Sequence, residues 1–242
     1  MSIDNYKLFI DNLSAENKLI LEEFFNNFDR HCDLQKNEKQ LLKEDFYNAL
    51  IYYASRGISL KKSLKLLDIN NLGGFYSRPS MVWYPLDDAA KIYPLSMKKG
   101  YMAVFRLSMY LKENVIPDIL QMALNFTIKR FPTFAVTVKK GFFWHHLDST
   151  KRRYCINKEN DIPCQSLKIS LSGSQTFRVI YYNNRISVEF FHILTDGTGG
   201  MIFLKTLVTE YFRLLGINSK GKDTFNINDL PNEKEIANEF DK

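Results

Sequence analysis

No hydrophobic run in this 242-residue sequence approaches the ~20 residues that a membrane-spanning helix needs. The N-terminal segment, residues 1–7, also lacks the basic stretch followed by an apolar core that is typical of a secretory signal. We therefore expect neither a membrane span nor a signal peptide.

Cysteine is scarce, and the three that occur are Cys32, Cys155 and Cys164. Their number is odd and none forms a Cys-x-x-Cys pair, so we expect reduced thiols in a cytoplasmic protein. Without clustered cysteines the sequence also offers no ligand set for a structural zinc ion, and we expect no metal.

Neither sign of charge dominates strongly. The chain has 33 basic and 27 acidic residues, a formal net charge of +6. This excess suits an anionic small molecule but does not indicate nucleic-acid binding. The hydrophobic fraction of 45% is ordinary for a globular protein, and the length allows one or two domains.

Residues 1–75 predict an all-helical N-terminal extension. Ser14 is a residue type that caps helices, and the apolar spacing after it predicts one helix. A second helical pattern ends near Gly57, and Ser59 precedes a third. The apolar positions of the three patterns are Leu19, Ile20, Phe24 and Phe28; Leu41, Leu42, Phe46, Leu50 and Tyr53; and Leu60, Leu64 and Leu67.

A helix-turn-helix nucleic-acid binder is an open alternative for residues 36–67, because Gly57 offers the turn and Lys61 and Lys62 are basic. Helices that simply pack on a larger domain are much commoner, so we favour that interpretation and expect no nucleic-acid partner.

A cluster of asparagine and glycine at residues 70–74, followed by Pro79, is the best candidate for a domain boundary. We therefore divide the chain into residues 1–75 and residues 76–242. The second part mixes strand and helix patterns. It predicts an α/β (α+β) lobe, a mixed and mostly antiparallel sheet packed by helices.

The first elements of this lobe are a strand over Met102–Leu111 and a helix that starts at Pro117 and ends before Pro132. Strands at residues 134–138 and 142–147 are expected to form a hairpin through residues 139–141. The next segment, residues 148–173, is polar and predicts only a short strand near residues 167–171.

A second hairpin is predicted from strands at residues 177–182 and 186–192, because Asn183 and Asn184 tolerate the positive φ of a tight turn. Alternate residues share one strand face. On one face of the second strand lie Ile186, Val188, Phe190 and His192. A glycine cluster follows, and then an amphipathic helix ending near Gly216. Its apolar stripe comprises Phe203, Leu204, Leu207, Val208, Tyr211 and Leu215.

The motif His-x-x-x-Asp-Gly at residues 192–197, between this strand and this helix, resembles the signature of the CoA-dependent acyltransferase superfamily. That superfamily has the chloramphenicol acetyltransferase-like fold and includes condensation domains. Residues 84–94, 129–134 and 141–144 resemble further segments of it, in the same order. The likeness is closest to bacterial alcohol acetyltransferase-type proteins and spans about residues 80–216, corresponding to the N-terminal lobe alone.

The resemblance implies acyl transfer from acyl-CoA to a small-molecule alcohol, without a tightly bound cofactor. In this chain it implies that His192 is the general base, because histidine is basic near neutral pH. It implies that Asp196 and Gly197 support the motif structurally. Thr198, Gly199 and Gly200 are expected to form a ligand-facing loop at the start of the helix.

Several alternatives remain open. In the resembling family an arginine pairs with the motif aspartate. Here Arg130 or Arg106 could take that place, and neither is assigned. The family's second lobe is not matched, so the chain is expected to be a fragment, to assemble with another chain, or to be a catalytically inactive interaction module. A core histidine and a solvated aspartate are the simplest alternatives for His192 and Asp196.

One other histidine pattern bears on metal binding. His145 and His146 lie next to each other, on opposite faces of a predicted strand, and have no third ligand nearby in the sequence. An ordinary hairpin strand is therefore the favoured interpretation.

Overall fold

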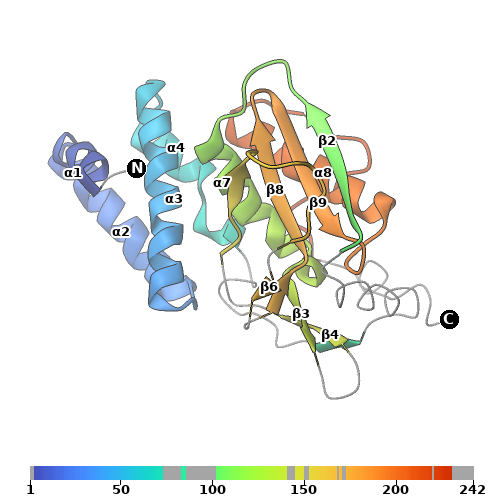
Figure 1. Ribbon diagram of the computed structural model, residues 1–242. Helices are drawn as coiled ribbons and strands as arrows, with labels where there is room; N and C mark the ends of the chain where they lie inside the picture. Colours follow the sequence, from blue (N-terminus) through green and yellow to red (C-terminus); the bar gives the residue numbers. More distant parts are fainter. Residues whose placement is uncertain are drawn as a thin grey trace.

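The computed structural model describes residues 3–72, 83–85, 102–140, 145–149, 153–167, 169–170, 173–219 and 221–230. Helices gather at the N-terminal end of the chain, and a mixed α/β lobe follows (Figure 1). The α/β class predicted from the sequence is therefore confirmed. The helical end comprises α1 (Ile3–Asp11), α2 (Ala15–His31), α3 (Lys36–Ser55), α4 (Leu60–Leu66) and the 3-10 turn η1 (Ile69–Leu72).

The three predicted helices begin and end close to the expected residues. Ser14 is the N-cap of α2, and its side chain accepts a hydrogen bond from the Asn17 N–H at 3.3 Å. Gly57 follows α3 with a positive φ of 72°, the conformation that glycine adopts most easily. Ser59 precedes α4, but its side chain makes no capping hydrogen bond.

The helical end and the lobe share one continuous hydrophobic core. Phe46 of α3 packs edge-on against Phe126, with ring centroids 6.2 Å apart. The hydroxyl of Tyr53, also on α3, donates to the main-chain oxygen of Leu214 at 2.8 Å. Because α3 belongs to this core, the domain boundary at residue 75 stays a prediction. Of the two lysines in the helix-turn-helix alternative, Lys61 forms an exposed ion pair with Glu16.

The sheet that carries the motif has four strands in the order β2–β9–β8–β5. Their bounds are β2 (Val104–Tyr110), β9 (Arg185–Phe191), β8 (Phe177–Tyr182) and β5 (Ile156–Lys158). The β8–β9 hairpin pairs Tyr182 with Arg185 and turns through Asn183 at φ 48°, as predicted. Strand β5 was not predicted, and it runs parallel to β8.

A second sheet has the order β1–β4–β3–β7–β6, from β1 (Trp83–Pro85), β4 (His145–Ser149), β3 (Val136–Lys140), β7 (Gly173–Gln175) and β6 (Ile169–Ser170). The β3–β4 pairing was predicted, but its register was wrong. Lys139 and Lys140 pair with His146 and His145 rather than forming the turn. The connection falls on residues 141–144, outside the described residues, as does the weak helical pattern predicted after residue 231.

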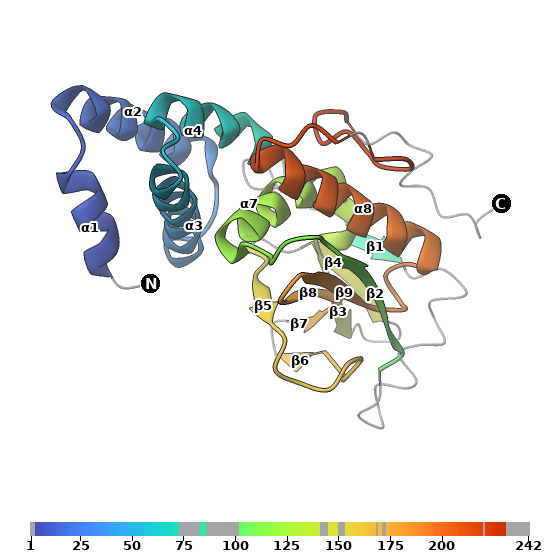
Figure 2. The same ribbon diagram turned by 90° about the horizontal axis from the view of Figure 1, so that it is seen from above.

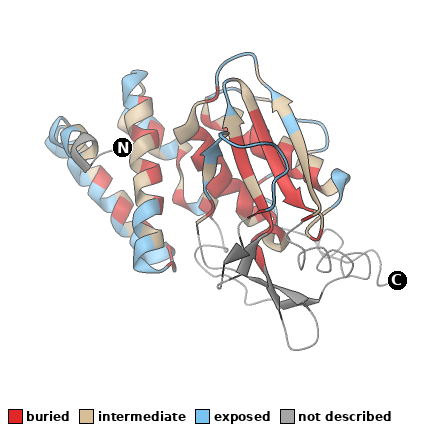
Figure 3. Ribbon diagram, in the orientation of Figure 1, coloured by how far each residue is buried: buried red, intermediate tan, exposed pale blue. Residues whose placement is uncertain are grey.

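Two helices, α7 (Pro117–Thr127) and α8 (Gly197–Leu214), cover one face of the four-stranded sheet (Figure 2). Pro117 stands in the first turn of α7, and the chain continues as 3-10 turns η3 (Ile128–Arg130) and η4 (Pro132–Phe134). Gly216 ends α8 with φ 78°. Buried residues concentrate where these helices meet β8 and β9 (Figure 3). Phe177, Phe190 and Phe203, all fully buried, pack there ring against ring.

Candidate functional site

His192 lies directly after β9, on the sheet face that α8 covers. Its backbone N–H donates to the Ala103 carbonyl at 2.8 Å, so the ladder with β2 extends one residue beyond the strand. The side chain is half-buried, whereas Phe190 two residues earlier is fully buried. The imidazole is therefore not sealed within the core.

An aromatic stack holds the imidazole from the side of β2. The rings of Phe105 and His192 lie with centroids 4.8 Å apart and planes inclined at 49°. Phe105 also stacks on Phe190, its partner across the two strands, at 5.5 Å. Because Phe190 is fixed in the core, it anchors Phe105, which in turn restricts the His192 ring. Sequence reasoning did not identify Phe105, because a single phenylalanine in a strand is ordinary.

Asp196 is the N-cap of α8. Its Oδ1 accepts a hydrogen bond from the Gly199 N–H at 2.8 Å, which satisfies one of the free amides at the helix start. Its side chain is exposed. Within the described residues it has no arginine partner, because Arg106 binds Glu159 and Glu189, and Arg130 lies over the Phe225 ring at 4.2 Å.

The three glycines at the start of α8 differ in what surrounds them. A Cβ at Gly200 would stand 3.0 Å from Phe190 Cε2 and 3.1 Å from Leu107 Cδ1, so glycine lets α8 approach the sheet closely. At Gly199 a Cβ would collide with Thr195 Oγ1. At Gly197 no atom of the described residues lies within 4 Å of that position, and φ is not positive. Thr198 beside it is exposed.

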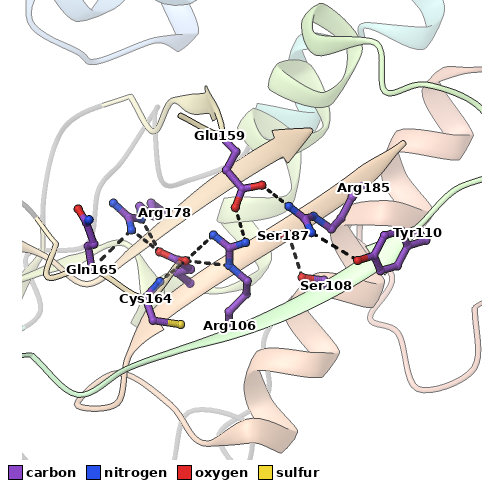
Figure 4. A network of polar contacts seen from close by, with 10 residues as sticks. Arg106, Ser108, Tyr110, Glu159, Cys164, Gln165, Arg178, Arg185 and Ser187 are labelled. Atoms are coloured by element: carbon purple, nitrogen blue, oxygen red, sulfur yellow. Dashed lines mark hydrogen bonds and ion pairs between the residues drawn. The ribbon is translucent and has the colours of Figure 1, made fainter. Parts of the chain in front are cut away.

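The opposite face of the same strand end carries a charged network (Figure 4). Glu189, fully buried on β9, accepts hydrogen bonds from Arg106 Nε at 2.8 Å and Arg178 Nε at 2.6 Å. It also accepts one from the Cys164 N–H at 2.7 Å. Arg106 also pairs with Glu159. The segment from Glu159 to Leu167, which we call the strap, is thereby bound across the back of the strand.

A small apolar cluster closes the strap beyond the charges. Leu167 packs with Phe191, Ile193 and Met102, all of them buried. His192 is thus held from two sides. Phe105 contacts its ring on the helix-covered face, and its chain neighbours Phe191 and Ile193 pack against Leu167 of the strap on the other face. One sequence signal could have identified this network. Glu189 stands between Val188 and Phe190 in a predicted strand, and the neighbouring predicted strands each contain an arginine.

Burial and ion pairing shift the pKa values of several carboxyl groups, and the direction of the shift differs from one group to the next. Burial would raise the pKa of Glu159, but hydrogen bonds from Arg106 and Arg185 outweigh burial and hold the pKa below its ordinary value. For Asp45 and Glu210, burial dominates and raises the pKa, although Arg153 and Arg213 respectively oppose it.

Two pockets formed by described residues lie away from His192. The larger, about 310 Å³, lies between the second half of α8 and residues 216–228, and the smaller, about 220 Å³, lies between α3, α7 and β5. In the part of the chain that the structure describes, no cluster of His, Cys, Asp and Glu could hold a metal ion. None of the helices in that part has both the length and the hydrophobicity to cross a bilayer.

Comparison with protein-family models finds no match, and neither does a search of curated proteins. Solved structures with a similar chain path include the starter condensation domain of rhizomide synthetase RzmA, with 13% sequence identity and a TM-score of 0.46. Its match covers 56% of this chain and 39% of that one. Another structure of this domain, of a mutant form, is a complex with C8-CoA.

Two further examples are the first condensation domain of the CDA synthetase and the X-domain from teicoplanin biosynthesis. The first shows 11% identity and a TM-score of 0.44, and covers 56% of this chain and 40% of that one. The second shows 18% identity and a TM-score of 0.44, and covers 58% and 34%. The chain therefore spans well under half the length of these proteins. The α/β assignment rests on the described helices and strands themselves.

Proposed function

We propose that this chain catalyses acyl transfer from acyl-CoA to an alcohol acceptor, with His192 as the general base. The observation that carries the proposal is the place of His192, half-buried at the end of β9 and just before α8, within a His-x-x-x-Asp-Gly motif. The ring is restrained by Phe105, and the turn that follows it is restrained by the Asp196 cap. A base that is held in one orientation is what proton transfer requires.

In this mechanism a ring nitrogen of His192 takes the proton of the acceptor hydroxyl as the oxygen attacks the thioester carbonyl carbon. The tetrahedral intermediate then collapses and the C–S bond breaks. The imidazolium returns the proton to the departing thiolate, so that the products are an ester and free CoA. General-base assistance of this kind contributes roughly 10²–10⁴-fold to the rate. No covalent bond to the enzyme forms.

The start of α8 is assigned to ligand contact. Helix N-termini carry unpaired amides that favour anions, and CoA is strongly anionic. Thr198 is exposed. A Cβ added at Gly197 would have no atom of the described residues within 4 Å, apart from those of its chain neighbours. We propose that Asp196, Gly199 and Gly200 shape this turn, whereas Gly197 and Thr198 face the ligand.

The test is release of free thiol from acetyl-CoA in the presence of a panel of primary alcohols. We expect His192→Ala to lower the rate by at least 100-fold while the protein stays folded. His31→Ala is the matched control, because His31 lies on α2, where its Nδ1 bonds to the Asn27 carbonyl of the same helix at 2.8 Å. Equal rates for the wild type and His192→Ala would refute the assigned role.

A second candidate, a catalytically inactive interaction module, is favoured by one observation. On the strap side of the sheet Tyr110 is 68% exposed and Ile162 is 72% exposed, and such large side chains are common in protein interfaces. Light scattering separates the two candidates. Stable assembly with another chain, together with no thiol release above background, favours the module. Thiol release by a monomer favours the enzyme.

A further inference from the structure

The smaller pocket lies where three distant parts of the chain meet. Its walls come from α3, from the first turns of α7, from β5 and the residues before it, and from β8. Figure 2 shows β5 at the edge of the sheet, on the side of the start of α7. The volume of about 220 Å³ can hold a small organic molecule, since a water occupies ≈ 30 Å³ of liquid.

The buried polar side chains at the floor of this pocket already have hydrogen-bond partners within the protein. Asp45 is buried, and Arg153 donates to both of its carboxylate oxygens at 2.5 Å, while Asn125 adds a bond at 2.9 Å. Gln121 donates to the Tyr154 carbonyl at 2.8 Å and accepts from the Ile156 N–H at 3.0 Å. The floor is therefore a neutralised and rigid surface, and its polar groups are not the ones that would select a ligand.

The rim is different. Its polar side chains make no hydrogen bond or ion pair with any residue, as far as the described chain shows. They are Asn48, Asp118, Lys158 and Tyr181. Asp118 is half-buried, and burial raises the pKa of its carboxyl group, although the positive charge of the chain's N-terminal amine opposes this rise. Its place in the first turn of α7 favours a carboxylate there, and no cationic side chain of the described residues forms an ion pair with it.

The rim thus presents one carboxylate and one ammonium, each without a partner among the described side chains, around the same space. An amide (Asn48), a phenol (Tyr181) and the apolar residues Pro117 and Ile156 line the same pocket. An ion of a single charge would meet one favourable and one unfavourable partner. A molecule that carries both charges is complementary to both.

We propose that this pocket binds a small zwitterion of amino-acid size, whose ammonium contacts Asp118 and whose carboxylate contacts Lys158. This site is separate from His192 and does not depend on the proposed acyl transfer. Because its walls include Asn48 of α3 and Lys158 of β5, the bound molecule would link the helical end of the chain to the lobe.

The test uses three probes of similar size on the full chain: L-norvaline, butylammonium and butyrate. Calorimetry and thermal shift are expected to show the tightest binding for norvaline. Asp118→Asn should weaken norvaline binding at least 10-fold, and Lys158→Gln should reduce it to the level of butylammonium. Matched controls are Asp161→Asn and Lys112→Gln, two exposed positions that are not among the pocket residues.

These outcomes decide the proposal. Absence of norvaline binding overturns it, and so does norvaline binding that Asp118→Asn leaves unchanged. Equal binding of norvaline and butylammonium, together with no effect of Lys158→Gln, overturns the zwitterion and leaves a cation site. Because Asp118→Asn and Lys158→Gln change rim residues that bond to no described side chain, their thermal midpoints without ligand should stay within about 2 °C of the wild type.

Discussion

One face of the β2–β9–β8–β5 sheet is apolar and covered by helices, whereas the other face of the same strands carries charges under the strap. Val188 and Phe190 point into the helix-covered core, and Glu189 between them lies fully buried among guanidinium groups. Apolar packing tolerates changes of shape at modest cost. A buried carboxylate is stable only while its partners remain. Adjacent residues of one strand should therefore respond very differently to substitution.

The largest expected effect comes from Glu189→Leu. It leaves Arg106 and Arg178 without their buried counter-charge, and loss of one partner of a buried ion pair costs about 3–5 kcal/mol. The comparison is Phe190→Leu, an apolar change one residue away that should cost less than half as much. Urea unfolding of the two variants measures the difference. Equal losses would contradict the distinction between the faces.

The next effect concerns the glycines at the start of α8. Gly200→Ala should cost about 1–3 kcal/mol, because its Cβ would press on Phe190 and Leu107. Gly197→Ala should be neutral or stabilising by up to about 1 kcal/mol, because the space beside it is open and its φ is compatible with alanine. Thermal unfolding compares the two stabilities. If Gly197→Ala nevertheless lowers thiol release, the loss arises from ligand approach.

Asp196→Ala should cost about 1 kcal/mol through loss of the helix cap. Asp196→Asn preserves an oxygen that can accept from Gly199 N–H, so it should restore most of the stability. If the aspartate instead works through an ion pair with an arginine, the asparagine variant will be as unstable as the alanine variant. The same urea experiment distinguishes these results.

The smallest expected effect is the pH dependence of the stability that Glu159 of the strap contributes. The pKa of Glu159 is lower in the folded chain than the ~4.3 of an unfolded glutamate, so protons bind the unfolded state more tightly. Its contribution is complete above about pH 4.3 and is lost as the pH falls through the lower folded value. The thermal midpoints of the wild type and Glu159→Gln should therefore converge on acidification.

The comparison with Glu159→Gln is needed because the pKa values of other carboxyl groups are shifted in the opposite direction. The pKa values of Asp45 and Glu210 are raised by burial, so their effect on stability becomes less favourable as the pH rises. These residues are common to both proteins and cancel in the difference. A gap between the two thermal midpoints that persists unchanged to about pH 3 would contradict the assigned role of Glu159.

Local signals allowed several elements to be predicted. Ser14 offered an N-cap, Pro117 a helix start and Asn183 a residue that tolerates positive φ, and each acts within a few residues of itself. Strand β5 could not be found this way. It has three residues, too few to show a period, and it exists because β8 lies alongside it. The β3–β4 register was missed because cross-strand pairing, rather than turn propensity, places Lys139 and Lys140.

By itself the sequence determined the order of the main helices and strands, the apolar face of β9 and the position of His192 at its end, because periodicity and capping depend on neighbours along the chain. Tertiary structure alone decided which groups surround that histidine. Phe105 is 87 positions away in the chain, and the arginines that bind Glu189 lie on two other strands. Such partners follow from strand order and register, which depend on contacts between distant segments.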